Sequence, residues 1–205
     1  ITAAVPIGAH VSVPVRLPDG ELYGMFCCLG PAADPTLNPR DLAMMHTLAS
    51  LAGEEIAREK DEADRLAVRR APVAAMLESG AFGTVLQPIW RLGHGRPIGF
   101  ETLTRFHAEP RQGPDRWFAD AADVGLGEAL ELAAINRALE TLHQLPADIY
   151  ITVNASPSTA CSPALHALLA GTDLSRLVLE ITEQQQFEAF DQLHRMLAPL
   201  RAAGL

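Results

Sequence analysis

From residue 82 onward, strand-like segments alternate with helix-like segments, and this order limits the possible folds more than any other feature. The strand-like segments are 82–90 (FGTVLQPIW), 96–106 (RPIGFETLTRF), 149–154 (IYITVN) and 177–182 (LVLEIT). The first two predict an antiparallel hairpin, and helices are expected up to about residue 144, from about 164 and from about 188. This order predicts an α/β fold with a parallel sheet, either an open doubly wound sheet or the first half of a barrel.

Three of these strands end in a polar residue that packing does not require. These residues are Glu101, Asn154 and Glu180. Because the carboxyl ends of parallel strands meet on one face, we expect the three side chains to converge. Two carboxylates brought together would repel each other unless a cation lay between them. Oxygen ligands alone favour a hard divalent cation such as Mg²⁺, Mn²⁺ or Ca²⁺.

The alternation of side chains along a strand places Glu101, Leu103 and Arg105 on one face, while Thr102 and Thr104 point away. A guanidinium beside metal-binding carboxylates can hold a phosphate oxygen through two hydrogen bonds. Together these groups indicate phosphoester chemistry. The alternative is structural: Glu101 and Arg105 form an ion pair, and the other two residues cap the helices that follow.

The N-terminal part predicts a β-hairpin over residues 10–29, with a turn at Leu17–Glu21, and then a long helix that Asn38 caps. Apolar residues along this helix repeat with a weak heptad pattern. Two interpretations stay open, a parallel dimer stalk and a solvated linker helix that packs only at its N-terminal half. A boundary is expected near Pro72. Cys27 and Cys28 lie within a strand and are expected to be core residues.

Composition excludes some classes of protein. The net charge is −9 and no cluster of Lys and Arg is present, which speaks against binding of a nucleic acid polymer. No apolar run is long enough to span a membrane. Three cysteines suit a reducing compartment, so a cytoplasmic location is expected. The chain has no initiator Met and stops within a pattern, so we expect it to be a fragment.

Five motifs resemble those of EAL-domain proteins, and they occur in the same order as in that family. The motifs are VLQPIW (85–90), GFETLTRF (99–106), PDRWFADAADVGL (114–126), VNASP (153–157) and LVLEITE (177–183). The resemblance implies a TIM-type (β/α) barrel with an opening hairpin, of which the N-terminal half is present. It further implies a phosphodiesterase that hydrolyses cyclic di-GMP to linear pGpG with two Mg²⁺ or Mn²⁺ ions.

The resemblance also assigns roles to individual residues. It implies metal ligation by Glu101, Asn154 and Glu180, substrate binding by Gln87, Leu103 and Arg105, and catalytic roles for Glu101 and for Glu183, which steadies a neighbouring loop. The signature reads Glu-Thr-Leu where the family has Glu-Ala-Leu, and we expect little effect because Thr102 points away from the ligands. The family's paired aspartates, lysine and later ligands are expected beyond Leu205, so this chain lacks the second half of the active site.

Residues 1–58 resemble the C-terminal part of a GAF domain, an α/β sensory module whose small ligand, if it has one, is unknown. The expected domains are therefore 1–58, a linker helix at 59–78, and the N-terminal part of the EAL domain at 79–205. We expect a homodimer formed through the linker helix and the EAL domain. The alternatives to a regulated phosphodiesterase are a catalytically inactive receptor for cyclic di-GMP and a signalling scaffold.

Overall fold

The computed structural model describes residues 7–93, 95–182 and 190–205. The chain forms two compact units, Ile1–Ala67 and Val68–Leu205. The long helix α1 (Pro39–Ser79) contributes its first part to the first unit and its last part to the second. Each unit is described separately below.

The first unit is built on an antiparallel hairpin of β1 (Ala9–Arg16) and β2 (Leu22–Gly30), as the sequence predicts. Gly20 in the connecting turn has a φ of 90°, which glycine adopts without strain. The register shifts between Val15 and Arg16, which marks a bulge or irregularity one residue after Pro14. Proline is tolerated here because a two-stranded sheet consists only of edge strands.

Helix α1 covers one face of this hairpin. The predicted cap is confirmed, since the Asn38 side chain accepts a hydrogen bond from the Arg40 amide at 2.9 Å. The small core of this unit consists of Val13, Val15, Met45 and Ala49. The prediction that Cys27 and Cys28 are core residues is wrong, because both are exposed. One helix cannot cover both faces of a hairpin, so much of β2 stays accessible.

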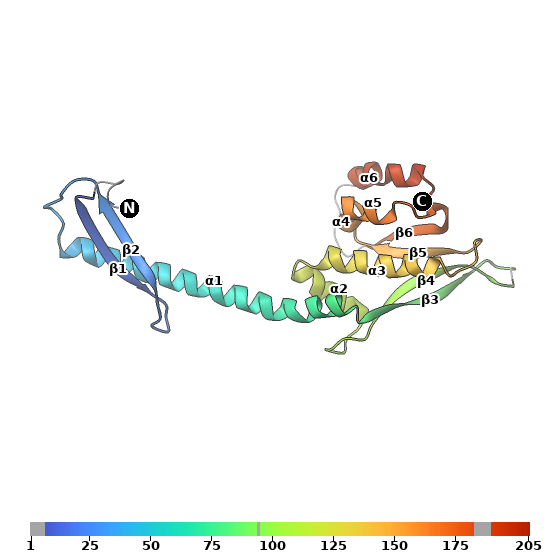
Figure 1. Ribbon diagram of the computed structural model, residues 1–205, viewed down its shortest axis with the longest axis horizontal. Helices are drawn as coiled ribbons and strands as arrows, with labels where there is room; N and C mark the ends of the chain where they lie inside the picture. The colour runs from blue at the N-terminus through green and yellow to red at the C-terminus, as the bar shows by residue number, and fades with distance from the viewer. Residues whose placement is uncertain (1–6, 94, 183–189) are drawn as a thin grey trace. The chain divides into compact units, whose positions relative to one another are not determined.

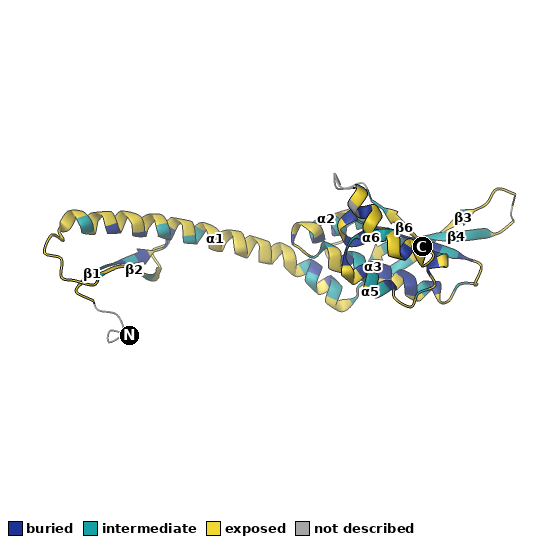
Figure 2. Ribbon diagram, turned by 90° about the horizontal axis from the view of Figure 1, so that it is seen from above, coloured by how far each residue is buried: buried dark blue, intermediate teal, exposed yellow. Residues whose placement is uncertain are grey.

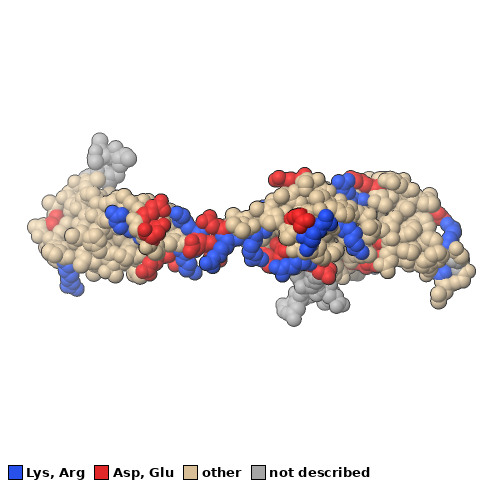
Figure 3. Space-filling model, turned by 90° about the horizontal axis from the view of Figure 1, so that it is seen from below, with Lys and Arg blue, Asp and Glu red and all other residues tan. Residues whose placement is uncertain are grey.

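The middle of α1 is exposed from residue 58 to residue 71 (Figure 2). The part of α1 before this stretch packs in the first unit, and Val73 and Met76 after it pack in the second. Acidic and basic side chains are interspersed along the helix (Figure 3), which suits a solvated surface. None of the helices in the described ranges has an apolar stretch long enough to cross a bilayer.

Pro72 lies inside α1 and does not end it. The two compact units divide a few residues earlier, between Ala67 and Val68. The helix continues to Ser79 because Val73 and Met76, each 1% exposed, pack into a core of the second unit. Burial of these two side chains offsets the backbone hydrogen bond that proline removes. Gly80, with a φ of 61°, then ends the helix in the left-handed conformation.

The approach of α1 to the hairpin depends on Gly53. A Cβ atom at this position would lie 2.1 Å from the carbonyl oxygen of Arg16. We therefore expect Gly53→Ala to lower the free energy of unfolding by about 1–3 kcal/mol, although alanine favours helix more than glycine does. The exposed Ser50→Ala substitution in the same helix serves as the control and should be neutral or slightly stabilising. Urea unfolding followed by circular dichroism measures both, and a Gly53→Ala protein as stable as the parent would contradict the packing.

The second unit is built on a four-stranded sheet in the order β3-β4-β5-β6 (Figure 1). The strands are β3 (Phe82–Trp90), β4 (Pro97–Phe106), β5 (Tyr150–Ala155) and β6 (Leu177–Ile181). The other elements are α2 (Pro114–Asp123), α3 (Gly127–Leu142), α4 (Pro157–Ala160), α5 (Pro163–Leu169), the 3₁₀ helix η1 (Leu174–Arg176) and α6 (Phe190–Ala202). Strands β3 and β4 are antiparallel, and β4, β5 and β6 are parallel. The predicted hairpin followed by a parallel sheet is confirmed.

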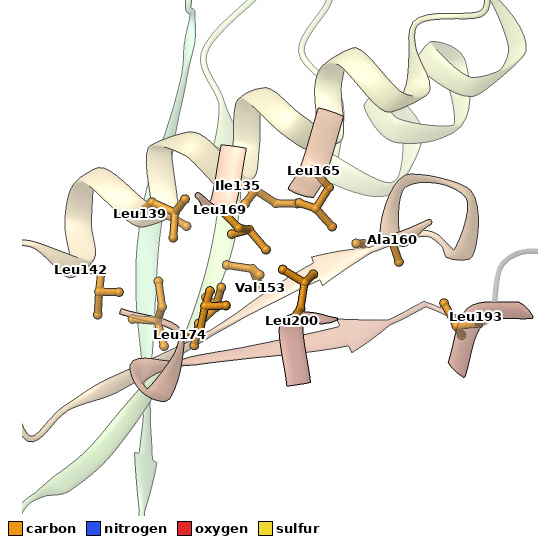
Figure 4. Packing of buried hydrophobic residues seen from close by; sticks show 14 residues of the cluster. Ile135, Leu139, Leu142, Val153, Ala160, Leu165, Leu169, Leu174, Leu193 and Leu200 are labelled. Carbon is orange, nitrogen blue, oxygen red and sulfur yellow. The ribbon is translucent and has the colours of Figure 1, made fainter. Parts of the chain in front are cut away.

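One face of this sheet is packed against helices. Ile135 and Leu139 of α3 point toward Val153 of β5, and Leu165 and Leu169 of α5 join the same cluster (Figure 4). A second cluster is centred on Trp117 of α2, which is 1% exposed and stacks on Phe106 with ring centroids 5.6 Å apart. Residues that alternate with these buried ones therefore face the other side of the sheet.

Candidate metal and phosphate site

The strand register places the three predicted metal ligands on the face of the sheet opposite the helices. Glu101 of β4 pairs with Thr152 of β5, and Asn154 pairs with Glu180 of β6. Residues paired across neighbouring strands point to the same side, as do residues two apart in one strand. Glu101, Asn154 and Glu180 therefore share one face.

Packing on the helix side fixes this orientation. Val153 and Ala155, which flank Asn154, are each 1% exposed, whereas Asn154 itself is exposed. A shift of the strand by one residue would bury the amide and expose two core side chains, at a cost of several kcal/mol. The hydrophobic core thus directs Asn154 to the open face.

Distances along the sheet follow from this register. Paired strands lie about 4.8 Å apart and rise about 3.3 Å per residue, and Asn154 lies two residues past the last pair of β4 and β5, so the Cα atoms of Glu101 and Asn154 lie about 8 Å or more apart. Asn154 and Glu180 are direct neighbours. Asn154 therefore stands between two glutamates on three consecutive parallel strands. Asn154 and Glu180 lie near the carboxyl ends of their strands, whereas Glu101 lies in the middle of β4, where its pairing with β5 ends, and not at the strand end that the sequence predicts.

The donor set suits a hard divalent cation, because two carboxylates and an amide supply only oxygen. Within the described residues, no three His, Cys, Asp or Glu side chains group closely enough to hold a metal ion. Glu101, Asn154 and Glu180 are two acids and an amide, so they do not form a cluster of that kind. Such ions take six or more oxygens, so water, substrate or further side chains must supply the remaining ligands.

The predicted substrate-binding residues lie on the same face as Glu101. Gln87 is its register partner on β3, and Leu103 and Arg105 follow it at two-residue intervals on β4. Arg105 is exposed, and its Nη1 donates to the Thr104 carbonyl at 3.0 Å. The ion pairs of the described residues do not include one between Arg105 and Glu101. Glu183 lies outside the described residues.

Sequence reasoning missed Glu131 of α3. Its Oε2 accepts hydrogen bonds from the Ser156 amide at 2.8 Å and from the Ser156 hydroxyl at 2.9 Å. Ser156 also caps α4 by accepting from the Thr159 amide at 3.3 Å. The carboxylate thus fixes the turn two residues after Asn154. The only signal in the sequence is an acid on the half-buried side of a helix, which does not identify a partner.

A cavity of about 500 Å³ opens between the carboxyl ends of β4 and β5 and the helices α2 and α3. Its apolar walls include Phe118 and Ile135, and its polar groups include Arg105, Asn154 and Glu131. Arg105 and Asn154 belong to the open face described above, so the cavity adjoins the candidate metal site. Its volume lies within the range of small-molecule sites.

Glu131 is expected to contribute to stability through Ser156. Glu131→Ala leaves the part-buried Ser156 amide without its acceptor, so the free energy of unfolding should fall by about 1–3 kcal/mol. Glu140→Ala on the same helix removes an exposed ion pair with Arg137 and an exposed hydrogen bond from Asn136, and should cost less than about 0.5 kcal/mol. Urea unfolding of both proteins gives the comparison. Equal losses would show that the Glu131 hydrogen bonds do not hold this turn.

The second unit is an α/β domain with an open four-stranded sheet, and one face of its parallel strands carries the oxygen ligands of the candidate site. The model of the EAL domain family matches residues 67–205, more than half of the chain. The chain belongs to the EAL domain family.

The curated relatives are themselves uncharacterised. A signalling protein of Caulobacter vibrioides is 35% identical over 128 residues, which cover 58% of this chain and 16% of the relative. A protein of Mycobacterium tuberculosis is 29% identical over 143 residues, which cover 63% of this chain and 46% of the relative. The chain thus spans less than half the length of these two relatives.

Solved structures share the fold. The Bacillus subtilis YkuI protein, solved with c-di-GMP and calcium, is 26% identical with a TM-score of 0.53, and the match covers 65% of this chain and 36% of YkuI. Klebsiella pneumoniae BlrP1, solved with manganese and c-di-GMP, is 27% identical with a TM-score of 0.50, covering 61% and 33%. The Xanthomonas citri FimX EAL domain, at 19% identity and a TM-score of 0.57 over 70% of this chain and 60% of FimX, supports the fold alone.

Proposed function

We propose that the intact protein is a metal-dependent phosphodiesterase that hydrolyses cyclic di-GMP to linear pGpG. One observation carries the proposal: Glu101, Asn154 and Glu180 lie on one face of three consecutive parallel strands. YkuI and BlrP1, both above 25% identity, were solved with c-di-GMP and a divalent cation, which supports the same ligands for this chain.

In this proposal Glu101, Asn154 and Glu180 hold two Mg²⁺ or Mn²⁺ ions, together with ligands from other residues, water and substrate. Bound ions of this kind supply a nucleophile from water at neutral pH and neutralise charge on the phosphate. Arg105 binds a phosphate oxygen through its guanidinium and orients the ester for in-line attack. Gln87 and Leu103 flank the substrate on the same face. We also propose that Glu183 steadies a neighbouring loop of the active site.

We place one guanine base of the substrate in the cavity beside Arg105 and Asn154. Its volume of about 500 Å³ admits a purine, and Phe118 and Ile135 offer apolar contacts to a base. Guanine presents N–H donors on its Watson–Crick edge. The Glu131 carboxylate lines the cavity and can accept from that edge through Oε1, since its hydrogen bonds within the described part of the chain both involve Oε2.

The remaining parts of the proposal concern regulation. The first unit acts as the C-terminal part of a GAF sensory domain with an unidentified small ligand or none, and α1 carries its signal to the EAL domain. The domains are 1–58, the linker helix 59–78 and 79–205, and the protein works as a homodimer in the cytoplasm. The exposed middle of α1 offers a surface through which two copies can associate.

The metal site is tested by Glu101→Gln in the intact protein with Mn²⁺. This change replaces a charged ligand with a neutral amide, so release of linear pGpG should fall about 100-fold or more. Glu140→Gln, on an exposed helix surface, is the matched control and should keep the parent rate. Chromatographic assay of pGpG measures both.

The same assay separates the alternatives. Activity that survives Glu101→Gln would contradict the mechanism. Binding of cyclic di-GMP by the parent protein without hydrolysis in any divalent metal would indicate a receptor, and no binding at all would indicate a scaffold.

The base cavity is tested by filling it. Ala134 lines the cavity from α3, so Ala134→Phe should raise the KM for cyclic di-GMP about tenfold with a smaller change in kcat. Ala129→Phe adds the same ring at an exposed position of α3 outside the cavity and should leave KM unchanged. An unchanged KM for Ala134→Phe would show that the base binds elsewhere.

A further inference from the structure

The pairing of β4 with β5 is short and ends at the proposed metal ligand. Gly99, Phe100 and Glu101 pair with Tyr150, Ile151 and Thr152, so the pairing covers three residues of each strand. By comparison, β5 and β6 pair over five residues. Beyond Glu101, residues 102–105 of β4 and residues 153–156 of β5 line the same cavity, so the strands have separated there.

A side-chain hydrogen bond crosses this seam at the point where the pairing ends. The hydroxyl of Thr102 donates to the carbonyl oxygen of Thr152 at 2.6 Å. Both residues are buried, with Thr102 8% and Thr152 3% exposed. Water therefore competes poorly for this bond, and a buried carbonyl that lost it would have to find another partner.

The bond joins the two strands that carry proposed metal ligands. Thr102 directly follows Glu101, and Thr152 precedes Asn154 by two residues. The distance between the Glu101 carboxylate and the Asn154 amide depends on the distance between these two strands. After Glu101, β4 and β5 have no further paired residues that would fix that distance. The alanine found here in the family signature has no hydroxyl and cannot form this bond.

We propose that Thr102 is a positioning residue that fixes the separation of β4 and β5 at the proposed metal site and thereby sets its affinity for divalent ions. This inference rests on the proposed function. Thr102 points away from the ligands, as the sequence predicts, and acts on the metal site through the backbone of Thr152 rather than by contact with the metal. From the sequence we expect little effect of threonine at this position, whereas the proposed role gives Thr102 an effect on the affinity for divalent ions.

The test compares Thr102→Val, Thr102→Ala and Thr102→Ser in the intact protein. Valine keeps the shape of threonine and loses the hydroxyl, alanine restores the family residue, and serine keeps the hydroxyl. Calorimetric titration with Mn²⁺ should show about five- to tenfold weaker binding for Val and Ala, and binding within about twofold of the parent for Ser. The Mn²⁺ concentration that gives half-maximal hydrolysis should rise by the same factor, with kcat at saturating Mn²⁺ little changed.

Thr84→Val is the matched control, because Thr84 lies on β3, the other neighbour of β4, and on the same face of the sheet as Thr102. It should leave Mn²⁺ binding unchanged. Equal Mn²⁺ affinity in the parent and in Thr102→Val would overturn the inference while leaving the proposed function intact. A Thr102→Val protein with a lower melting temperature but unchanged Mn²⁺ affinity would also overturn the inference, since it would show that Thr102 has a purely structural role. A parent protein that neither binds Mn²⁺ nor hydrolyses cyclic di-GMP would instead overturn the proposed function.

Discussion

Burial of one face of the sheet is the constraint on which the candidate site depends. Val153 and Ala155 pack against the helices, so Asn154 between them must face the other way. Because β5 is in register with β4 and β6, Glu101 and Glu180 point to the same side of the sheet as Asn154. Hydrophobic burial, which has no direction of its own, thereby places three polar side chains on one face.

The strands, their order and the shared face could be predicted from the sequence because they follow from short-range patterns. Apolar runs marked each strand, and the two-residue period of a strand put Glu101, Leu103 and Arg105 together. The placement of Glu101 on the same face as Asn154 and Glu180 required only that the strands be parallel and adjacent. The five EAL motifs supplied the roles, which composition and periodicity alone do not give.

Other features were missed because they depend on contacts between distant elements. Cys27 and Cys28 lie in an apolar strand, but a hairpin covered by one helix leaves them exposed. The hydrogen bonds from Ser156 to Glu131 and from Thr102 to Thr152 join residues 25 and 50 positions apart in the sequence. No local sequence pattern predicts either bond.

The most direct test of the account is the position of the ion itself. Crystals of the intact protein soaked with Mn²⁺ can be examined by anomalous diffraction at the manganese edge. The account predicts anomalous density with oxygens of Glu101, Asn154 and Glu180 at about 2.2 Å. Manganese bound at another place, or these three side chains turned to different faces of the sheet, would contradict it.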